Sequence, residues 1–137
     1  MAHSYIKILI HYVFSTKNRK KIITAPLQKR LWAYMGGIAR ENNMKALAIG
    51  RIEDHVHLLI ILPSTLSISK VIQLIKGGSS KWVHDTFPNF YYFKWQGGYA
   101  AFSVDMSRTK NLITYINTQK EYPGCIGEQQ RSCDQPL

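Results

Sequence analysis

Residues 54–63 read DHVHLLIILP and form a strongly strand-like stretch near the middle of the sequence. Long apolar side chains follow one another without a break up to Pro63, a pattern typical of a buried β-strand. Residues two apart on a strand point to the same side, so His55 and His57 share one face. The opposite face is apolar and carries Val56, Leu58, Ile60 and Leu62. The strand is therefore predicted to bury one face and to present two imidazoles on the other.

The segments around this strand alternate between strand-like and helical patterns. Strand-like runs occupy residues 5–15, 44–50, 90–95 and 99–104, and the last two are two short strands or one strand with a turn. Apolar residues at helical spacing mark residues 26–43, 68–87 and 108–122. Ser67 is the expected cap of the second helix, and the glycine pair at 77–78 predicts a kink inside it.

The order of these elements predicts the architecture. The sequence β, α, β, β, α, β and then one further helix fits an α+β sandwich of the ferredoxin-like or RRM-like type. A central antiparallel sheet is expected, with helices on one side and a C-terminal helix that carries Tyr115. This layout hosts RNA-binding modules, small enzymes and regulators alike, so the fold alone leaves the function open.

Length and the end segments set the domain organisation. The chain has 137 residues, which suits one hydrophobic core, so residues 1–124 are expected to form a single domain. Residues 125–137 show no periodicity and are expected to be a mobile tail, and their Cys125 and Cys133 lack the spacing of a zinc knuckle or redox motif. Charged and histidine residues interrupt the apolar N-terminal run, so a cytoplasmic location is expected.

Charge points to an anionic partner. Lys and Arg total 18 against 8 Asp and Glu, which gives a formal net charge of +10. Because the basic residues do not form one cationic amphipathic helix, nucleic acid is favoured over a membrane surface. Each basic side chain alone could be ordinary solvated surface. The expected phosphate contacts are Lys17, Arg19, Lys20, Lys21, Lys76, Lys81, Arg108 and Lys110.

The histidine pair is a candidate metal site. Two neutral imidazoles on one strand face can bind one divalent ion. The alternative is that one histidine is a hydrogen-bonded core residue and the other is exposed, and the pair by itself does not decide between them. Asp54 could support a ligand only if the backbone bulges there. His11, on the first strand, is expected to pack beneath the pair or to hydrogen bond behind it.

The last helix carries a second group of polar residues. In NLITYINTQKEY, residues 111–122, Tyr115 and Gln119 are four apart and lie on one helical face beside an apolar stripe. The amide oxygen of glutamine is a hard neutral ligand that suits magnesium or manganese. The alternative is an ordinary amphipathic helix, with Tyr115 half-buried and Gln119 in solvent.

Taken together, the HVH strand and the YINTQ helix resemble the single-tyrosine HUH transposases of small bacterial insertion sequences. STKNRKK at 15–21, LIKGGSSKW at 74–82 and WQGGYAAFSV at 95–104 follow that family's order, so the resemblance spans nearly the whole chain. It implies that Tyr115 is the nucleophile and that His55, His57 and Gln119 are the ligands of a magnesium or manganese ion. No nucleotide cofactor is implied.

The resemblance also implies partners and a reaction. The family cleaves and rejoins single-stranded DNA through a five-prime phosphotyrosine and binds hairpins at element ends. Its members work as homodimers in which the tyrosine helix of one subunit completes the metal site of the other. The superfamily also includes domesticated relatives acting on repeated extragenic hairpins, and the short chain with one tyrosine favours a transposase.

Two other functions remain open on the sequence. One is a single-stranded nucleic-acid-binding module without chemistry, for which the positive charge and strand aromatics would suffice. The other is a metal-dependent hydrolytic nuclease in which the histidines activate water and Tyr115 is structural. A covalent protein–DNA adduct separates both from the transposase.

Overall fold

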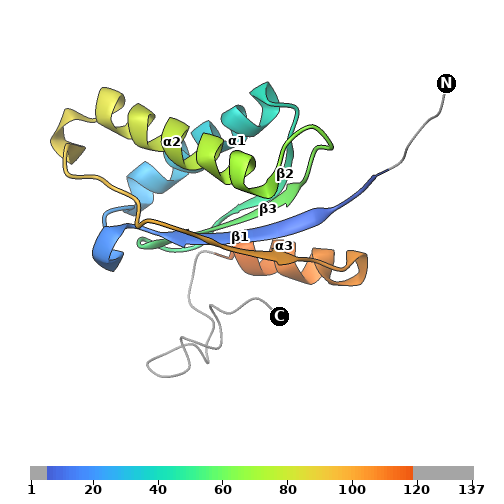
Figure 1. Ribbon diagram of the computed structural model, residues 1–137. Helices are drawn as coiled ribbons and strands as arrows, with labels where there is room; N and C mark the ends of the chain where they lie inside the picture. Colours follow the sequence, from blue (N-terminus) through green and yellow to red (C-terminus); the bar gives the residue numbers. More distant parts are fainter. Residues whose placement is uncertain (1–5, 119–137) are drawn as a thin grey trace.

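A computed structural model describes residues 6–118, in which four strands form one antiparallel sheet with helices on both faces (Figure 1). The strands are β1 Leu9–Ser15, β2 Lys45–Gly50, β3 His55–Ile61 and β4 Ala100–Ser103. Their order across the sheet is β2-β3-β1-β4, so β3 and β1 are central. The HVH stretch therefore lies in the middle of the sheet, where both of its faces are covered.

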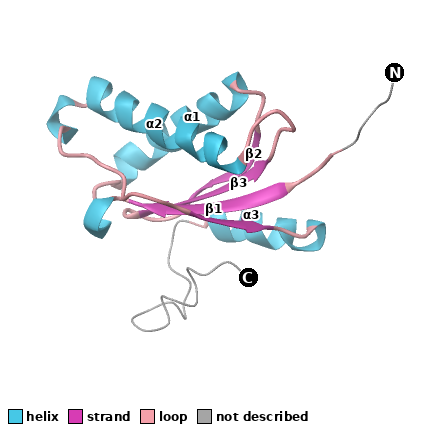
Figure 2. Cartoon of the chain, viewed as in Figure 1, coloured by secondary structure: helices cyan, strands magenta, loops and turns pink. Residues whose placement is uncertain are grey.

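Within residues 6–118, three α-helices and three short 3-10 turns connect and cover the strands (Figure 2). The α-helices are α1 Ala25–Glu41, α2 Ile68–Thr86 and α3 Thr109–Asn117. The 3-10 turns are η1 Lys17–Arg19, η2 Pro88–Phe90 and η3 Met106–Arg108. Helices α1 and α2 lie on one face of the sheet, and α3 lies on the other (Figure 1).

The larger core lies between the sheet and the α1–α2 layer. Alternate residues of the two central strands point into it, and Tyr12, Leu58 and Ile60 are completely buried there. Leu31 of α1 and Ile75 of α2 meet them from the helices. Because the side chains of β3 alternate, this apolar packing fixes which side the two histidines take.

A smaller apolar cluster lies on the opposite face, under α3. Its buried members are Leu9, Ala48, Leu59, Leu112 and Ile116. Helix α3 thus docks through a short apolar stripe, as its spacing predicted. The pairing of β2 with β3 is irregular between Ala46 and Ala48.

These observations confirm the predicted α+β fold, the antiparallel β2–β3 pair and the cap of α2, where the Lys70 amide donates to Ser67 Oγ at 3.0 Å. Three details differ. The glycine pair lies inside one continuous α2. Residues 90–95 are not a strand but follow η2, and Thr16–Trp95 is an isolated bridge. The strand-like pattern of residues 90–95 arose because Phe93 and Trp95 are buried in the main core, although the segment that carries them is irregular.

The third difference concerns the tyrosine helix. It ends at Asn117, and Thr118 has extended backbone angles of φ −80° and ψ 100°, so the helix is shorter than the predicted 108–122. Gln119 and the predicted tail at 125–137, with Cys125 and Cys133, lie outside the described residues. Within 6–118, none of the helices combines the length and apolar character that crossing a bilayer requires.

Candidate active site

The central strands gather three histidines on the face that α3 covers. In the β1–β3 register, Val13 is opposite His57 and Ser15 is opposite His55. His11 lies two residues before Val13 and therefore points to the same side of β1. The ring centroids of His55 and His57 are 6.4 Å apart, and those of His11 and His57 are 5.0 Å apart. The face opposite the main core is therefore lined with imidazoles.

One ring nitrogen of His57 has a hydrogen-bond partner among residues 6–118, and the other has none. His57 is completely buried, and its Nδ1 lies 2.9 Å from Nε2 of His11. Its Nε2 is buried and has no hydrogen-bond partner among residues 6–118. Burial, helped by the nearby His11, Arg51 and His55, lowers the pKa of His57 to about 2, so the ring is neutral. A neutral imidazole with an unused nitrogen is what a metal ligand requires.

His11 is the residue behind His57. Burial lowers its pKa to about 4, so it too is neutral and hydrogen bonds to His57 without adding charge. With the proton on Nδ1 of His57, the bond to His11 leaves the lone pair of His57 on Nε2. His11 therefore hydrogen bonds to the back of the His57 ring, and its supporting role for a metal ligand stays a prediction.

His55 is supported in the same way by Asp54. Asp54 Oδ1 accepts from His55 Nδ1–H at 2.9 Å, which fixes the lone pair on Nε2. Burial opposes ionisation of Asp54, but its bond and charge contact with His55, together with Arg19, outweigh burial and hold the carboxyl pKa below its ordinary value. Arg19 places Nε 3.7 Å from Asp54 Oδ2. Asp54 reaches His55 because it precedes the first residue of β3 and is free of the strand's alternation.

Tyr115 meets this face from the last turn of α3. Its ring stands edge-on to His57, with centroids 5.6 Å apart and an interplanar angle of 70°. In this structure Tyr115 contacts a histidine of its own chain. In the arrangement that the resemblance implied, the tyrosine helix instead lies against the histidines of the partner subunit.

Arg51 is a site residue that the sequence did not reveal. It follows β2 directly, and its side chain is only 2% exposed. Its guanidinium carbon lies 4.3 Å from the centre of the Tyr115 ring, and Nη1 donates to the Tyr115 and Thr118 carbonyl oxygens at 3.4 and 3.2 Å. In the sequence it belonged to the RIED connection between two strands, where nothing marks a buried charge.

The described part of the site fits a metal ion without completing its ligand set. Its candidate donors are the imidazoles of His55 and His57, and the orphaned Nε2 of His57 is the observation that favours a ligand there. Within residues 6–118, no three His, Cys, Asp or Glu side chains are grouped so that they could hold a metal. The predicted third ligand, Gln119, is outside the described residues.

The predicted phosphate contacts fall into three groups. Lys17, Arg19, Lys20 and Lys21 are exposed in and after η1, at the His55 end of β1. Arg108 and Lys110 lie at the start of α3, exposed to solvent. Two of the predicted lysines have protein partners: Lys76 Nζ donates to the Gln96 and Gly98 carbonyls, both at 2.8 Å, and Lys81 pairs with Asp85. These two have less freedom to reach a phosphate.

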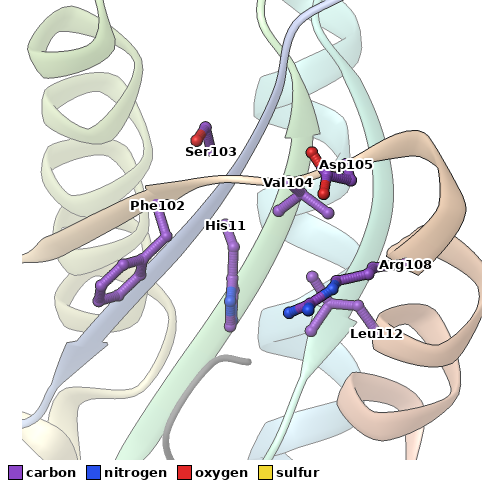
Figure 3. A pocket seen from close by; sticks show the side chains of 7 residues that line it. All are labelled: His11, Phe102, Ser103, Val104, Asp105, Arg108 and Leu112. Carbon is purple, nitrogen blue, oxygen red and sulfur yellow. The ribbon is translucent and has the colours of Figure 1, made fainter.

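Two hollows flank the histidine face. One, of about 190 Å³, is lined by His55 and by the turn at Gly97 and Gly98. The other, of about 300 Å³, lies beside His11 between β4 and the start of α3. Figure 3 shows the His11 ring with Phe102 on one side and Arg108 on the other. The site is therefore open to solvent on either side of the buried imidazoles.

The family model described as "Transposase IS200 like" matches residues 4–119 of the chain. The chain belongs to the IS200-like transposase family. This family is the one that the HVH strand and the tyrosine helix indicated, so the resemblance to HUH tyrosine transposases is confirmed.

Curated relatives and solved structures agree with membership of the IS200-like family. Transposases for insertion sequence element IS200 from Salmonella typhimurium strain LT2 and from Salmonella typhi are each 26% identical over 134 residues, covering 94% of this chain and 87% of theirs. A Deinococcus radiodurans R1 protein assigned as a transposase superposes with a TM-score of 0.69 at 22% identity, covering 89% of this chain and 98% of that one.

A second solved structure is a REP-associated tyrosine transposase bound to a REP hairpin. Its TM-score is 0.60 at 17% identity, and the match covers 85% of this chain and 68% of that one. At these identities the structural matches establish the fold of the IS200-like chain and leave its substrate to be argued from its own residues.

Proposed function

We propose that this IS200-like transposase cleaves and rejoins single-stranded DNA through a covalent bond between Tyr115 and a five-prime phosphate. The observation that carries the proposal is the position of the Tyr115 ring, 5.6 Å from the ring of His57 and on the only sheet face of residues 6–118 that carries buried imidazoles. A nucleophile beside candidate metal ligands is the arrangement that phosphodiester transfer needs.

The reaction balances without any cofactor that carries energy. Tyr115 Oη attacks the phosphorus, the new Tyr–O–P bond forms, and the bond from phosphorus to the three-prime oxygen breaks. The tyrosine proton ends on the released three-prime hydroxyl. Because one phosphate diester replaces another, a second three-prime hydroxyl can reverse the step and join a different strand end. No nucleotide cofactor is needed.

A phenol with a pKa of about 10 is a weak nucleophile near neutral pH, so the protein must orient it and neutralise the phosphate. His55 and His57, with Gln119 as the third ligand, would hold a magnesium or manganese ion, which when bound supplies charge neutralisation at a non-bridging phosphate oxygen. Asp54 and His11 orient the two imidazoles through Nδ1. Buried side chains hold these partners in place before DNA arrives.

The substrate is single-stranded DNA next to a hairpin, at the ends of a mobile element. The exposed basic cluster from Lys17 to Lys21 lies at the end of β1 where His55 begins β3, so a DNA backbone crossing the site would meet it. The relative bound to a REP hairpin supports a hairpin as the recognised element. We extend the proposal to a single transposase domain over residues 1–124 that acts as a homodimer.

A denaturing gel tests the proposal. The protein is mixed with labelled single-stranded hairpin DNA and manganese or magnesium, denatured, and examined for a slower protein band that carries the label. We expect that band with the native chain and not with Tyr115→Phe. An adduct that persists in Tyr115→Phe would remove Tyr115 from its role.

The same gel separates the other two functions. Cleaved DNA without an adduct would indicate a hydrolytic nuclease, and bound but uncut DNA would indicate a binding module. His57→Ala should abolish cutting whether the protein is a transposase or a hydrolytic nuclease. It therefore tests whether cutting needs the histidine site, and only the adduct distinguishes the two enzymes. A matched control is His84→Ala, because His84 hydrogen bonds to the Phe93 carbonyl, away from the site.

A further inference from the structure

Arg51, the buried arginine beside Tyr115, has a positive backbone φ angle that is energetically unfavourable for a residue with a side chain. Arg51 has φ 113°, a region that side chains other than glycine rarely adopt. It directly follows Gly50, the residue that pairs with His57 across β2 and β3. A residue at the edge of the histidine face is therefore held in an unfavourable conformation with its charge buried. Such outliers gather at functional sites.

The Arg51 side chain contacts the end of α3. The last carbonyl groups of a helix lack partners within the helix, and a positive charge near them is stabilising. Helix α3 has no basic residue in its own last turn. Arg51 supplies one from β2, because Nη1 donates to the Tyr115 and Thr118 carbonyls.

The same guanidinium also fixes the tyrosine ring. Its central carbon lies 4.3 Å from the ring centroid, which is the distance of a close cation–π contact. His57 meets the ring edge-on. A ring held by a cation on its face and a histidine at its edge cannot turn freely, so the phenol oxygen has a defined place over the site.

We infer that Arg51 is a positioning residue for the nucleophile. It caps the C-terminal end of the tyrosine helix and holds the Tyr115 ring against His57, so that Tyr115 Oη is in place when DNA binds. This inference rests on the proposed role of Tyr115 as nucleophile. Arg51 itself does not touch the reacting atoms.

A rate measurement separated from binding tests the inference. We expect Arg51→Ala to lower the single-turnover rate of adduct formation by about 100-fold, the scale of a misplacement of about 1 Å, while the dissociation constant for hairpin DNA stays the same. Arg51→Lys keeps the positive charge but loses the planar guanidinium, with its paired N–H donors and its flat stacking surface. We therefore expect its rate to lie between those of Arg51→Ala and the native chain. Added guanidinium ion, below concentrations that unfold the protein, should restore part of the Arg51→Ala rate, whereas urea should not.

Arg30→Ala is the matched control. The guanidinium of Arg30 also stacks on an aromatic ring, 4.7 Å from the centroid of Phe87, but on the helical layer away from the histidines. We expect its rate and DNA affinity to match those of the native chain. If Arg51→Ala is folded and cleaves at the native rate, or if its loss of rate is matched by a loss of DNA affinity, the inference is wrong.

A readout without DNA separates this inference from the proposed function. The ring resonances of Tyr115, assigned in carbon-labelled protein by their disappearance in Tyr115→Phe, should move in Arg51→Ala and stay in place in Arg30→Ala. If the native chain forms no adduct, the proposed function fails and the ring resonances still decide whether Arg51 holds Tyr115. If Arg51→Ala does not fold, Arg51→Lys and Arg51→Gln are compared in the same way.

Discussion

The two faces of the sheet are made from the same strands and have opposite characters. On β3, Leu58 points into the apolar layer under α1 and α2, and the preceding His57 points to the polar layer under α3. Both side chains are completely buried. The first face is closed by aliphatic packing, whereas the second contains unused nitrogens and a buried guanidinium.

A small domain can accommodate a polar site on the sheet face opposite its main core. Buried imidazoles and a buried arginine cost free energy unless they are well paired, and their small apolar cluster offers little to offset that cost. The larger core on the opposite face supplies the stability, so the α3 face can keep groups that serve chemistry. Mutations on the two faces should therefore differ in kind, and the following variants test this contrast.

The largest expected effect is on the α3 face. His57→Ala removes a proposed metal ligand, and we expect the rate of adduct formation to fall by at least about a thousandfold, since a metal contributes several kcal/mol to the transition state. The free energy of unfolding should fall by only about 1–3 kcal/mol, the cost of leaving His11 Nε2 without its partner. Single-turnover assays and urea denaturation measure the two quantities. A folded His57→Ala with native activity would contradict the comparison.

The adjacent residue should show the reverse pattern. Leu58→Ala opens a cavity in the main core, so the free energy of unfolding should fall by about 2–5 kcal/mol. Its cleavage rate per folded molecule should match the native rate, because Leu58 faces away from the histidines. Urea denaturation and a single-turnover assay at low temperature check both. If Leu58→Ala instead impaired cleavage while leaving stability intact, the two faces would not have separate roles.

Much of this division could be predicted from the sequence, because strand alternation is a local property. HVHLLI alone predicts that the histidines share one face and that Val56, Leu58 and Ile60 share the other, and the structure has this arrangement. The helical stripe of α3 was equally visible. These predictions need only the period of each element and its apolar residues.

Features set by distant contacts could not be predicted. Arg51 is buried because α3, far along the chain, packs over it, and neither its positive φ nor its contact with Tyr115 has a local signal. The end of α3 at Asn117 was also missed, because residues 108–122 keep helical spacing with no glycine or proline before Pro123. The roles of His55, His57, Gln119 and Tyr115 remain predictions, and the experiments above test those of His57 and Tyr115.

A smaller effect is expected for the residue behind His57. His11→Ala removes the partner of His57 Nδ1, so we expect the affinity for manganese to fall by about 10–100-fold, the usual scale for a residue that orients a metal ligand. Calorimetric titration with manganese measures this affinity. His84→Ala is the control and should bind manganese as the native chain does. Equal affinities in His11→Ala and the native chain would show that His57 needs no orientation from His11.

The smallest effects belong to the helical layer, where a pair of neighbouring glycines tests how closely it is packed. A Cβ added at Gly77 meets nothing within 4 Å, whereas one at Gly78 would lie 2.8 Å from Cδ1 of Ile38 on α1. Because alanine favours a helix over glycine, Gly77→Ala should raise the free energy of unfolding by about 0.5–1 kcal/mol. Gly78→Ala has the same propensity gain but must displace Ile38, so it should be less stable than Gly77→Ala. Urea midpoints of the two variants measure the difference, and equal midpoints would mean that α1 and α2 are not in close contact at Gly78.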